Sequence, residues 1–260
     1  MFKSFQPNKT LTSKEWAVLL TIQVGLLSLL WSAGDSLSIP GPVDTLNALG
    51  RLIKEEGLLY DLFVVSFRIN IEAIAITAVL SIGLAYLTVL PVMRPLGELC
   101  SKFRFLPMTG LVTPFTLAFG GGHWLKVSLL TFGMCVFFIT SMTAVVASIS
   151  KSDWDQARSL RMSSWRAVRE VVVLGKADEA FEVLRQNAAI GWMMLTMVEG
   201  LVRSEGGVGS VLLNQAKYRH WDAVFAIMGT LLLLGVIQDR VIVGLKGFFC
   251  PYATLKLERR

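Results

Sequence analysis

Long apolar segments alternate with shorter polar ones along most of this chain. About 20 residues of α-helix cross the hydrocarbon core of a membrane, because each residue adds roughly 1.5 Å. The alternation therefore predicts an all-α integral membrane protein with about six transmembrane helices. The expected spans are residues 16–33, 62–90, 105–119, 123–149, 188–202 and 223–249.

The longest polar interval, residues 151–186, lies between the fourth and fifth expected spans. It holds seven Lys or Arg and six Asp or Glu residues, and apolar residues recur among them at roughly helical spacing. This spacing predicts two short amphipathic helices. Ser152 is the expected cap of the first helix, and Ser163 or Ser164 that of the second. A pair of helices between two spans offers a surface on which a soluble protein can dock.

Composition and charge agree with a membrane protein and indicate its orientation. Hydrophobic residues make up 53% of the 260 residues, and the net charge is +6. If both termini are cytoplasmic, 18 of the 25 Lys and Arg lie on cytoplasmic segments, including a loop at 91–104, as the positive-inside rule requires. The first 15 residues lack the layout of a signal peptide. We therefore expect a cytoplasmic N-terminus at 1–15 and a single transmembrane domain at 16–260 that contains the polar interval.

The sequence holds no recognisable catalytic or nucleotide-binding motif. The three cysteines are widely separated, and the two histidines, His123 and His220, each adjoin a Trp at an expected span end. These spacings give no metal site. Basic stripes with interleaved aromatics, typical of nucleic-acid binding, are also missing. We expect no catalytic residue, no metal, no cofactor bound by this chain and no nucleic-acid partner.

Three ionisable residues, Arg68, Glu72 and Glu199, fall inside expected spans, where a charge costs about 2.5–3.5 kcal/mol at the membrane centre. Arg68 and Glu72 are four residues apart and share one helical face, so one explanation is a structural ion pair. The alternative is that Arg68 faces a solute pathway and draws in an anion, while Glu72 tempers its field. The same two explanations apply to Glu199, which has Arg203 four residues further on.

The polar interval resembles the cytoplasmic loop of permease subunits in binding-protein-dependent ABC importers. That loop reads Glu-Ala-Ala, three residues, Gly, nine residues, Ile, one residue, Leu-Pro. Here Asp155-Gln156-Ala157 stands at the triplet and Arg161 at the Gly, while the last three positions are Val171, Val173 and Leu174. The resemblance implies that a short helix in this loop docks in a groove of a cytoplasmic ATPase. The implied coupling residues are Asp155, Gln156, Ala157, Arg158, Leu160, Arg161 and Met162.

Further stretches, in order from about residue 46 to residue 251, are similar to the nitrate, sulfonate, taurine and bicarbonate branch of these permeases. Glu72 departs from that pattern, because a Gly is usual there. The stretches that carry the resemblance are Ser66-Phe67-Arg68, Phe119-Gly120-Gly121-Gly122 with Lys126, Trp192 with Glu199, Gly207-Val208-Gly209, and Asp239-Arg240.

The resemblance implies the permease subunit of a type I ABC importer in the bacterial cytoplasmic (inner) membrane. It also implies two copies of this chain, embedded in lipid, two ATPase subunits that bind ATP and Mg²⁺, and an external or periplasmic solute-binding protein. The solute would be a small anion, and the chain itself would not be an enzyme. An alternative is a permease-derived scaffold or regulatory subunit, since Arg161 replaces the Gly of the loop. A membrane-embedded enzyme is disfavoured by the missing catalytic motif.

Overall fold

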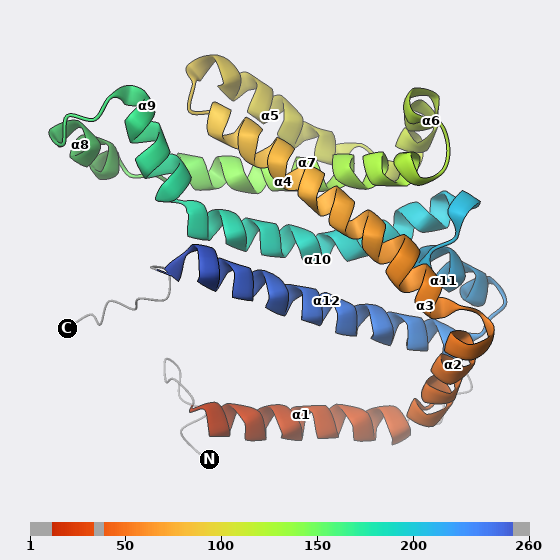
Figure 1. The fold of residues 1–260 in the computed structure, drawn as a ribbon. Helices are drawn as coiled ribbons and strands as arrows, with labels where there is room; N and C mark the ends of the chain where they lie inside the picture. The colour runs from red at the N-terminus through yellow and green to blue at the C-terminus, as the bar shows by residue number, and fades with distance from the viewer. Residues whose placement is uncertain (1–11, 34–38, 252–260) are drawn as a thin grey trace.

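The computed structural model describes residues 12–33 and 39–251, and all regular secondary structure in these ranges is helical. The long helices lie roughly side by side and form an elongated bundle (Figure 1). The expected all-α membrane architecture is thereby confirmed. The long helices are α1 (Ser13–Ala33), α4 (Phe67–Leu87), α7 (His123–Ala147), α10 (Ala177–Leu201) and α12 (Trp221–Phe249).

Among the described residues, three helical segments are long and apolar enough to cross a membrane: Leu58–Leu87, His123–Ala147 and Trp221–Phe249. They match the second, fourth and sixth expected spans. The other three expected spans are also helical, as α1, as the short apolar helix α6, and as the second half of α10. The count of six spans stays a prediction. The expected cytoplasmic N-terminus lies mostly outside the described residues.

Shorter helices connect the long ones. Two of them, η2 and η5, are π-helical, a wider helix that often occurs at functional sites. The short helices are α2 (Pro42–Glu55), α3 (Leu58–Tyr60), η2 (Asp61–Ser66), η3 (Pro91–Met93), α5 (Arg94–Lys102), η4 (Phe103–Phe105), α6 (Met108–Phe119), α8 (Lys151–Ser159), α9 (Ser164–Ala167), η5 (Val168–Leu174), η6 (Arg203–Glu205) and α11 (Val208–Lys217).

The centre of the bundle is formed by α4, α7 and α10, whose buried apolar side chains form one cluster. Gly191 of α10 allows close packing there, because a Cβ at this position would lie 3.1 Å from the Met134 methyl group of α7. Leu130 and Met134 are fully buried as a result. These three helices form the frame on which both ends of the molecule are built.

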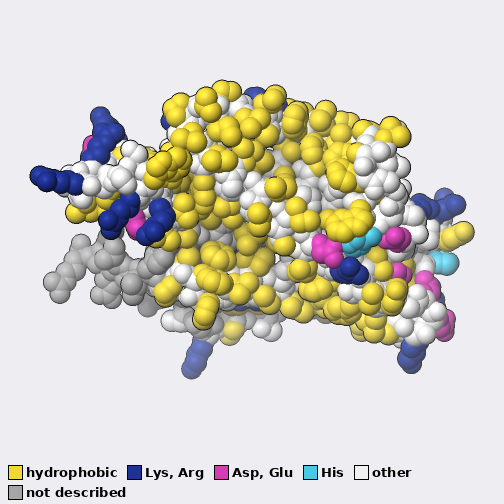
Figure 2. Space-filling model, turned by 45° about the horizontal axis from the view of Figure 1, so that its top comes forward, with side chains coloured by type: hydrophobic (Ala, Val, Ile, Leu, Met, Phe, Trp, Pro, Cys, Tyr) yellow, Lys and Arg dark blue, Asp and Glu magenta, His cyan; other side chains and the backbone are white. Residues whose placement is uncertain are grey.

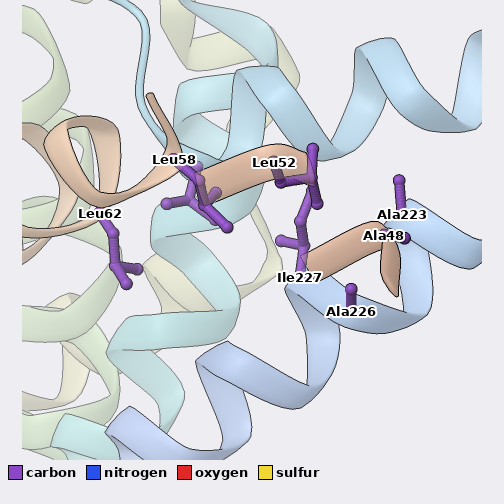
Figure 3. Packing of buried hydrophobic residues seen from close by; sticks show 8 residues of the cluster. Ala48, Leu52, Leu58, Leu62, Ala223, Ala226 and Ile227 are labelled. Carbon is purple, nitrogen blue, oxygen red and sulfur yellow. The ribbon is translucent and has the colours of Figure 1, made fainter. Parts of the chain in front are cut away.

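A second cluster closes one end of the bundle, where α2 crosses α12 (Figure 3). Ala48 and Leu52 of α2 pack against Ala223 and Ile227 of α12, and Leu58 continues the same apolar layer. The small alanines let the two helices approach closely. The chain that leads into α4 is therefore fixed to the start of α12.

The expected loop at 91–104 is wrong, because most of it forms α5, which packs along α7. A Cβ on Gly97 would lie 2.8 Å from Cγ2 of Thr88 and 3.6 Å from Cγ2 of Thr143 on α7. The missing side chain of Gly97 thus lets α5 pack against α7. The charges of this segment had indicated a loop instead. As a consequence, Lys102 and Arg104 do not lie in a connecting loop at the end of the bundle.

Candidate functional site

Helix α8 begins at a capping box within the polar interval. The Ser150 hydroxyl accepts a hydrogen bond from the Asp153 backbone N–H at 3.2 Å, and the Asp153 carboxylate accepts one from the Ser150 N–H at 3.2 Å. The expected cap at Ser152 is therefore wrong by two residues, while Ser163 does stand at the N-cap position of α9. Because its N-terminus is satisfied by its own residues, α8 needs no distant partner to form.

Helix α8 ends in a Schellman motif with Arg161 in the left-handed region, at φ 51°. The Arg161 N–H donates to the Arg158 carbonyl at 2.9 Å, and the Met162 N–H donates to the Ala157 carbonyl at 3.2 Å. Glycine is the usual residue in this conformation, which costs other residues about 1–2 kcal/mol. Arg161 thus keeps the backbone shape that a glycine favours at this position.

The loop presents a mixed surface at one end of the molecule (Figure 1). Ala157 is buried and Met162 half-buried, whereas the Leu160 and Trp165 residues are 63% and 68% exposed. Asp155 and Arg158 form an exposed ion pair at 3.4 Å. Gln156, also exposed, borders a hollow of about 340 Å³ between α8 and η5. Exposed apolar residues within a charged rim suit contact with another protein.

The two short helices expected in the polar interval are present as α8 and α9, and the second charged run belongs to a different helix, since from Ala177 it forms the start of α10. Arg185 joins this part of α10 to α12, with bonds to Glu182 at 2.6 Å and to Asp239 at 3.0 Å. The Arg185 guanidinium holds the pKa of the Glu182 carboxyl below its usual range through this hydrogen bond. The projecting part of the loop is therefore residues 150–176.

Arg68 and Glu72 pair as their spacing predicts, at 2.8 Å. Glu72 also contacts His123 at 2.6 Å, a partner that the sequence did not reveal. The Arg68 side chain is 66% exposed, while those of Glu72 and His123 are 32% and 24% exposed. The Glu72–His123 contact therefore joins α4 to the start of α7, while the Arg68 guanidinium remains accessible.

Glu199 is fully buried near the C-terminal end of α10 and lies at the centre of a polar cluster beside α11, the helix at the end opposite α8 (Figure 1). Its carboxylate accepts hydrogen bonds from the Ser66 hydroxyl at 2.6 Å and from the Gly209 backbone N–H at 2.8 Å. Arg203 does not join it, because Arg203 donates to the Gly200 carbonyl at 3.3 Å. Glu199 therefore joins α10 to the end of η2 and to the start of α11.

Three successive backbone N–H groups at the start of α11 are bound by side chains from elsewhere in the chain. Gly207 donates to Asp61 at 3.0 Å, Val208 donates to Ser66 at 2.9 Å, and Gly209 donates to Glu199. Carboxylates are favoured at this site by the unpaired N–H groups and by the helix dipole. The site is filled from within, so these groups are not free for a solute.

Glycines make this approach possible. A Cβ on Gly207 would lie within the contact radius of the Glu199 carboxylate, and a Cβ on Gly209 would meet the Thr196 carbonyl of α10. Gly207 also has φ 105°, which other residues rarely adopt. The Gly-Val-Gly stretch thus serves the contact between α11 and α10.

Lys126 supplies the positive charge of this cluster from α7. It is fully buried, and its ammonium donates to the Gly206 carbonyl at 2.8 Å. The carboxylates of Asp61, Glu199 and Glu205 are within its electrostatic reach. A lone Lys in an apolar span was a signal for such a site, although the sequence did not indicate its partners. Among the described residues, no three His, Cys, Asp or Glu side chains gather into a metal site.

Figure 2 shows how charge is distributed over one face of the molecule. The middle of this face is mostly hydrophobic, with Lys and Arg prominent toward one end and a mixture of acidic, basic and His side chains toward the other. An apolar band between two charged ends is typical of a protein that crosses a membrane.

Comparison with known proteins finds similarity at the level of structure. No protein-family model and no curated protein match the chain. Among solved structures, it is similar to one of the MetNI methionine ABC transporter in an inward-facing conformation, with 18% sequence identity and a TM-score of 0.49. The similarity covers 79% of this chain and 99% of that one.

Proposed function

We propose that this chain is the transmembrane permease subunit of a binding-protein-dependent ABC importer for a small anion. In this proposal two copies form the pathway in the bacterial inner membrane, with both termini cytoplasmic. Cytoplasmic ATPase subunits bind ATP and Mg²⁺, and an external binding protein delivers the solute. The chain itself carries no catalytic residue.

The observation that carries this proposal is the form of the projecting loop. Helix α8 is capped at both ends and exposes Leu160 beside the Asp155–Arg158 pair. A short rigid helix with an apolar anchor can transmit movement of a bound ATPase to the bundle. Arg161 has the left-handed backbone that a Gly favours at this position. The replacement of Gly by Arg is therefore no argument against a coupling role for this loop.

The contacts of the charged residues divide the candidate pathway positions. Glu199 is fully buried and each of its carboxylate oxygens accepts a hydrogen bond from within the chain, which supports a structural role. Glu72 is held by two cationic or titratable partners, Arg68 and His123. Arg68 keeps an accessible guanidinium, so it is the member of this set that can meet an anion.

The test is co-purification of the full chain from membranes, with Leu160→Asp as the disrupting variant and Leu46→Asp as its control. Leu46 is 67% exposed on α2, close to the 63% of Leu160, but α2 lies at the other end of the molecule from α8 (Figure 1). An ABC ATPase should accompany the unmodified chain and the control. Its recovery should fall at least about tenfold with Leu160→Asp, because a buried apolar anchor is lost from the interface.

Two outcomes would contradict the proposal. If the unmodified chain brings no ATPase, the scaffold alternative takes its place. If the ATPase stays bound to Leu160→Asp and also to a variant in which Asp155 and Arg158 exchange charge signs, then α8 is not the docking helix. Mass analysis of the intact complex should give two copies of this chain, and a single copy would remove the paired pathway.

A further inference from the structure

The segment between α5 and α6 lies near the middle of the membrane-crossing part of the molecule. The Phe103 ring lies 6.2 Å from the Phe132 ring of α7, and the Met108 sulfur lies against Gly133, 3.3 Å from where its Cβ would be. Phe132 and Gly133 are within three residues of residue 135, the midpoint of α7 (123 to 147). Residues 103–108 therefore cross the bundle at this depth instead of at its end.

The backbone is irregular at the same place. Helix α5 ends at Lys102, a single 3-10 turn follows, and Leu106 is extended at φ −76° and ψ 127° before α6 begins at Met108. In hydrocarbon, backbone N–H and C=O groups without helical partners cost several kcal/mol each. Such a break is found at membrane depth where it is buried in protein or lines a water-filled cavity.

Two exposed cations lie at this break, Lys102 at the end of α5 and Arg104 within the 3-10 turn. No carboxylate of the described residues lies within ion-pair distance of Lys102 or Arg104. The Arg104 guanidinium lies over the Phe105 ring, 5.1 Å from its centroid. Across residues 94–119 the one acidic residue is Glu98. A lipid surface does not suit two unpaired charges at this depth.

We propose that Lys102 and Arg104 line an aqueous cavity at mid-membrane and hold a small anion there on its way through the protein. This assignment rests on the proposed permease function, in which a second copy would bring two more cations to the same cavity. The Arg guanidinium suits the two oxygens of an oxyanion. Phe103, next to Lys102 in the chain, packs on Phe132, which in turn packs on Phe115. Such rings form a low-dielectric wall, which strengthens the field of nearby cations.

The test measures thiol reactivity in membrane vesicles that contain the full chain with its three native cysteines replaced by Ser. The Arg104→Cys thiol is treated with two small methanethiosulfonates, one ending in a sulfonate and one in a trimethylammonium. Both reagents should react, since the cavity holds water. The anionic reagent should react faster than the cationic one, because the Lys102 ammonium attracts it. Adding Lys102→Gln should lower the anionic-to-cationic rate ratio by about fivefold or more, because one unit charge near 4 Å in water changes the rate of each reagent by roughly fivefold, and in opposite directions.

Two controls accompany this measurement. Lys54→Gln removes one cation from α2 at the end of the molecule and should leave the ratio unchanged. Val79→Cys, at a position of α4 that is 74% exposed, should react with neither reagent if it faces lipid. A silent Arg104→Cys thiol would show that the break faces lipid or packed protein and would overturn the proposal. A ratio unaffected by Lys102→Gln would equally overturn it.

The result separates this proposal from the proposed function, because the reactivity needs neither an ATPase nor the solute. If an ATPase co-purifies with the chain but the Arg104→Cys thiol does not react, the permease function stands and the proposed cationic cavity is rejected. Anion-selective reactivity in a chain that brings no ATPase supports the cavity and removes its assignment to an importer.

Discussion

The two ends of the bundle carry short amphipathic helices of similar length that finish in the same way. Helix α8 and helix α11 both end in a Schellman motif with an arginine in the left-handed region, Arg161 at φ 51° and Arg219 at φ 60°. In α11 the Arg219 N–H donates to Ala216 and the His220 N–H donates to Gln215, matching the bonds at the end of α8. The C-terminal geometry therefore does not distinguish the two ends.

The N-termini of these two helices do distinguish them. Helix α8 is capped by Ser150 and Asp153 from its own sequence, whereas α11 is capped by Asp61, Ser66 and Glu199 from η2 and α10. A locally capped helix can move as a unit without breaking distant bonds. The comparison teaches that the α8 end is built for contact and movement, and the α11 end for holding the bundle together.

The largest expected effect comes from removing the buried cation at the α11 end. Lys126→Met should lower the free energy of unfolding by about 3 kcal/mol or more, because three carboxylates lose their nearby cation and Gly206 loses a donor. For a chain of this size, this corresponds to a fall of roughly 6–12 °C in Tm, measured by thermal unfolding in detergent. Lys54→Met is the control and should change Tm little. Equal shifts in both variants would contradict the comparison.

A smaller effect is expected where α11 touches α10. Gly209→Ala should cost about 2 kcal/mol, since a Cβ there would lie 2.8 Å from the Thr196 α-carbon. Gly229→Ala on α12 is the matched control, because nothing lies within 4 Å of its Cβ position. It should leave the protein as stable or slightly more so. The two variants are compared by the same thermal unfolding, and a Gly209→Ala protein as stable as the control would show that the helices can separate without loss.

The smallest effect is a local gain at the α8 end. Arg161→Gly should slow hydrogen exchange in α8 and α9 by about two- to fivefold, because glycine relieves a left-handed strain of about 1–2 kcal/mol while losing more chain entropy on folding. Arg219→Gly makes the same change at the other end and should slow exchange in α11 alone. Faster exchange of α8 in Arg161→Gly would mean that the Arg161 side chain stabilises the loop through contacts.

The apolar pattern predicted most of the helices because length and composition along one segment are enough to specify a membrane-crossing helix. The i,i+4 pair of Arg68 and Glu72 was predictable for the same reason, since both residues belong to one helical face. The helix within 91–104 was not predictable, because the charges of this segment indicate a loop. The contribution of Gly97 to packing depends on Thr88 and Thr143, which are distant in the sequence or lie on another helix.

The polar cluster at Glu199 could not be predicted from the sequence, because its members are far apart along the chain. Most of its bonds join residues 80 to 146 positions apart, such as Lys126 with Gly206 and Asp61 with Gly207. Periodicity along a helix carries no information about such pairs. The left-handed backbone at Arg161 was likewise not predictable, because an arginine gives no indication of positive φ, whereas a glycine does. The expected coupling role of the loop residues stays a prediction.

The way α11 is capped has a consequence for synthesis. Ser66 and its partner Val208 are separated by 142 residues. At roughly 5–20 residues per second, the ribosome needs about 7–30 s to supply that partner after Ser66 has been made. During this interval Asp61 and Ser66 lack the backbone N–H groups that they bind in the folded protein. The arrival of the Gly-Val-Gly stretch then supplies these partners, so the first half of the chain waits for its last quarter before it reaches its final packing.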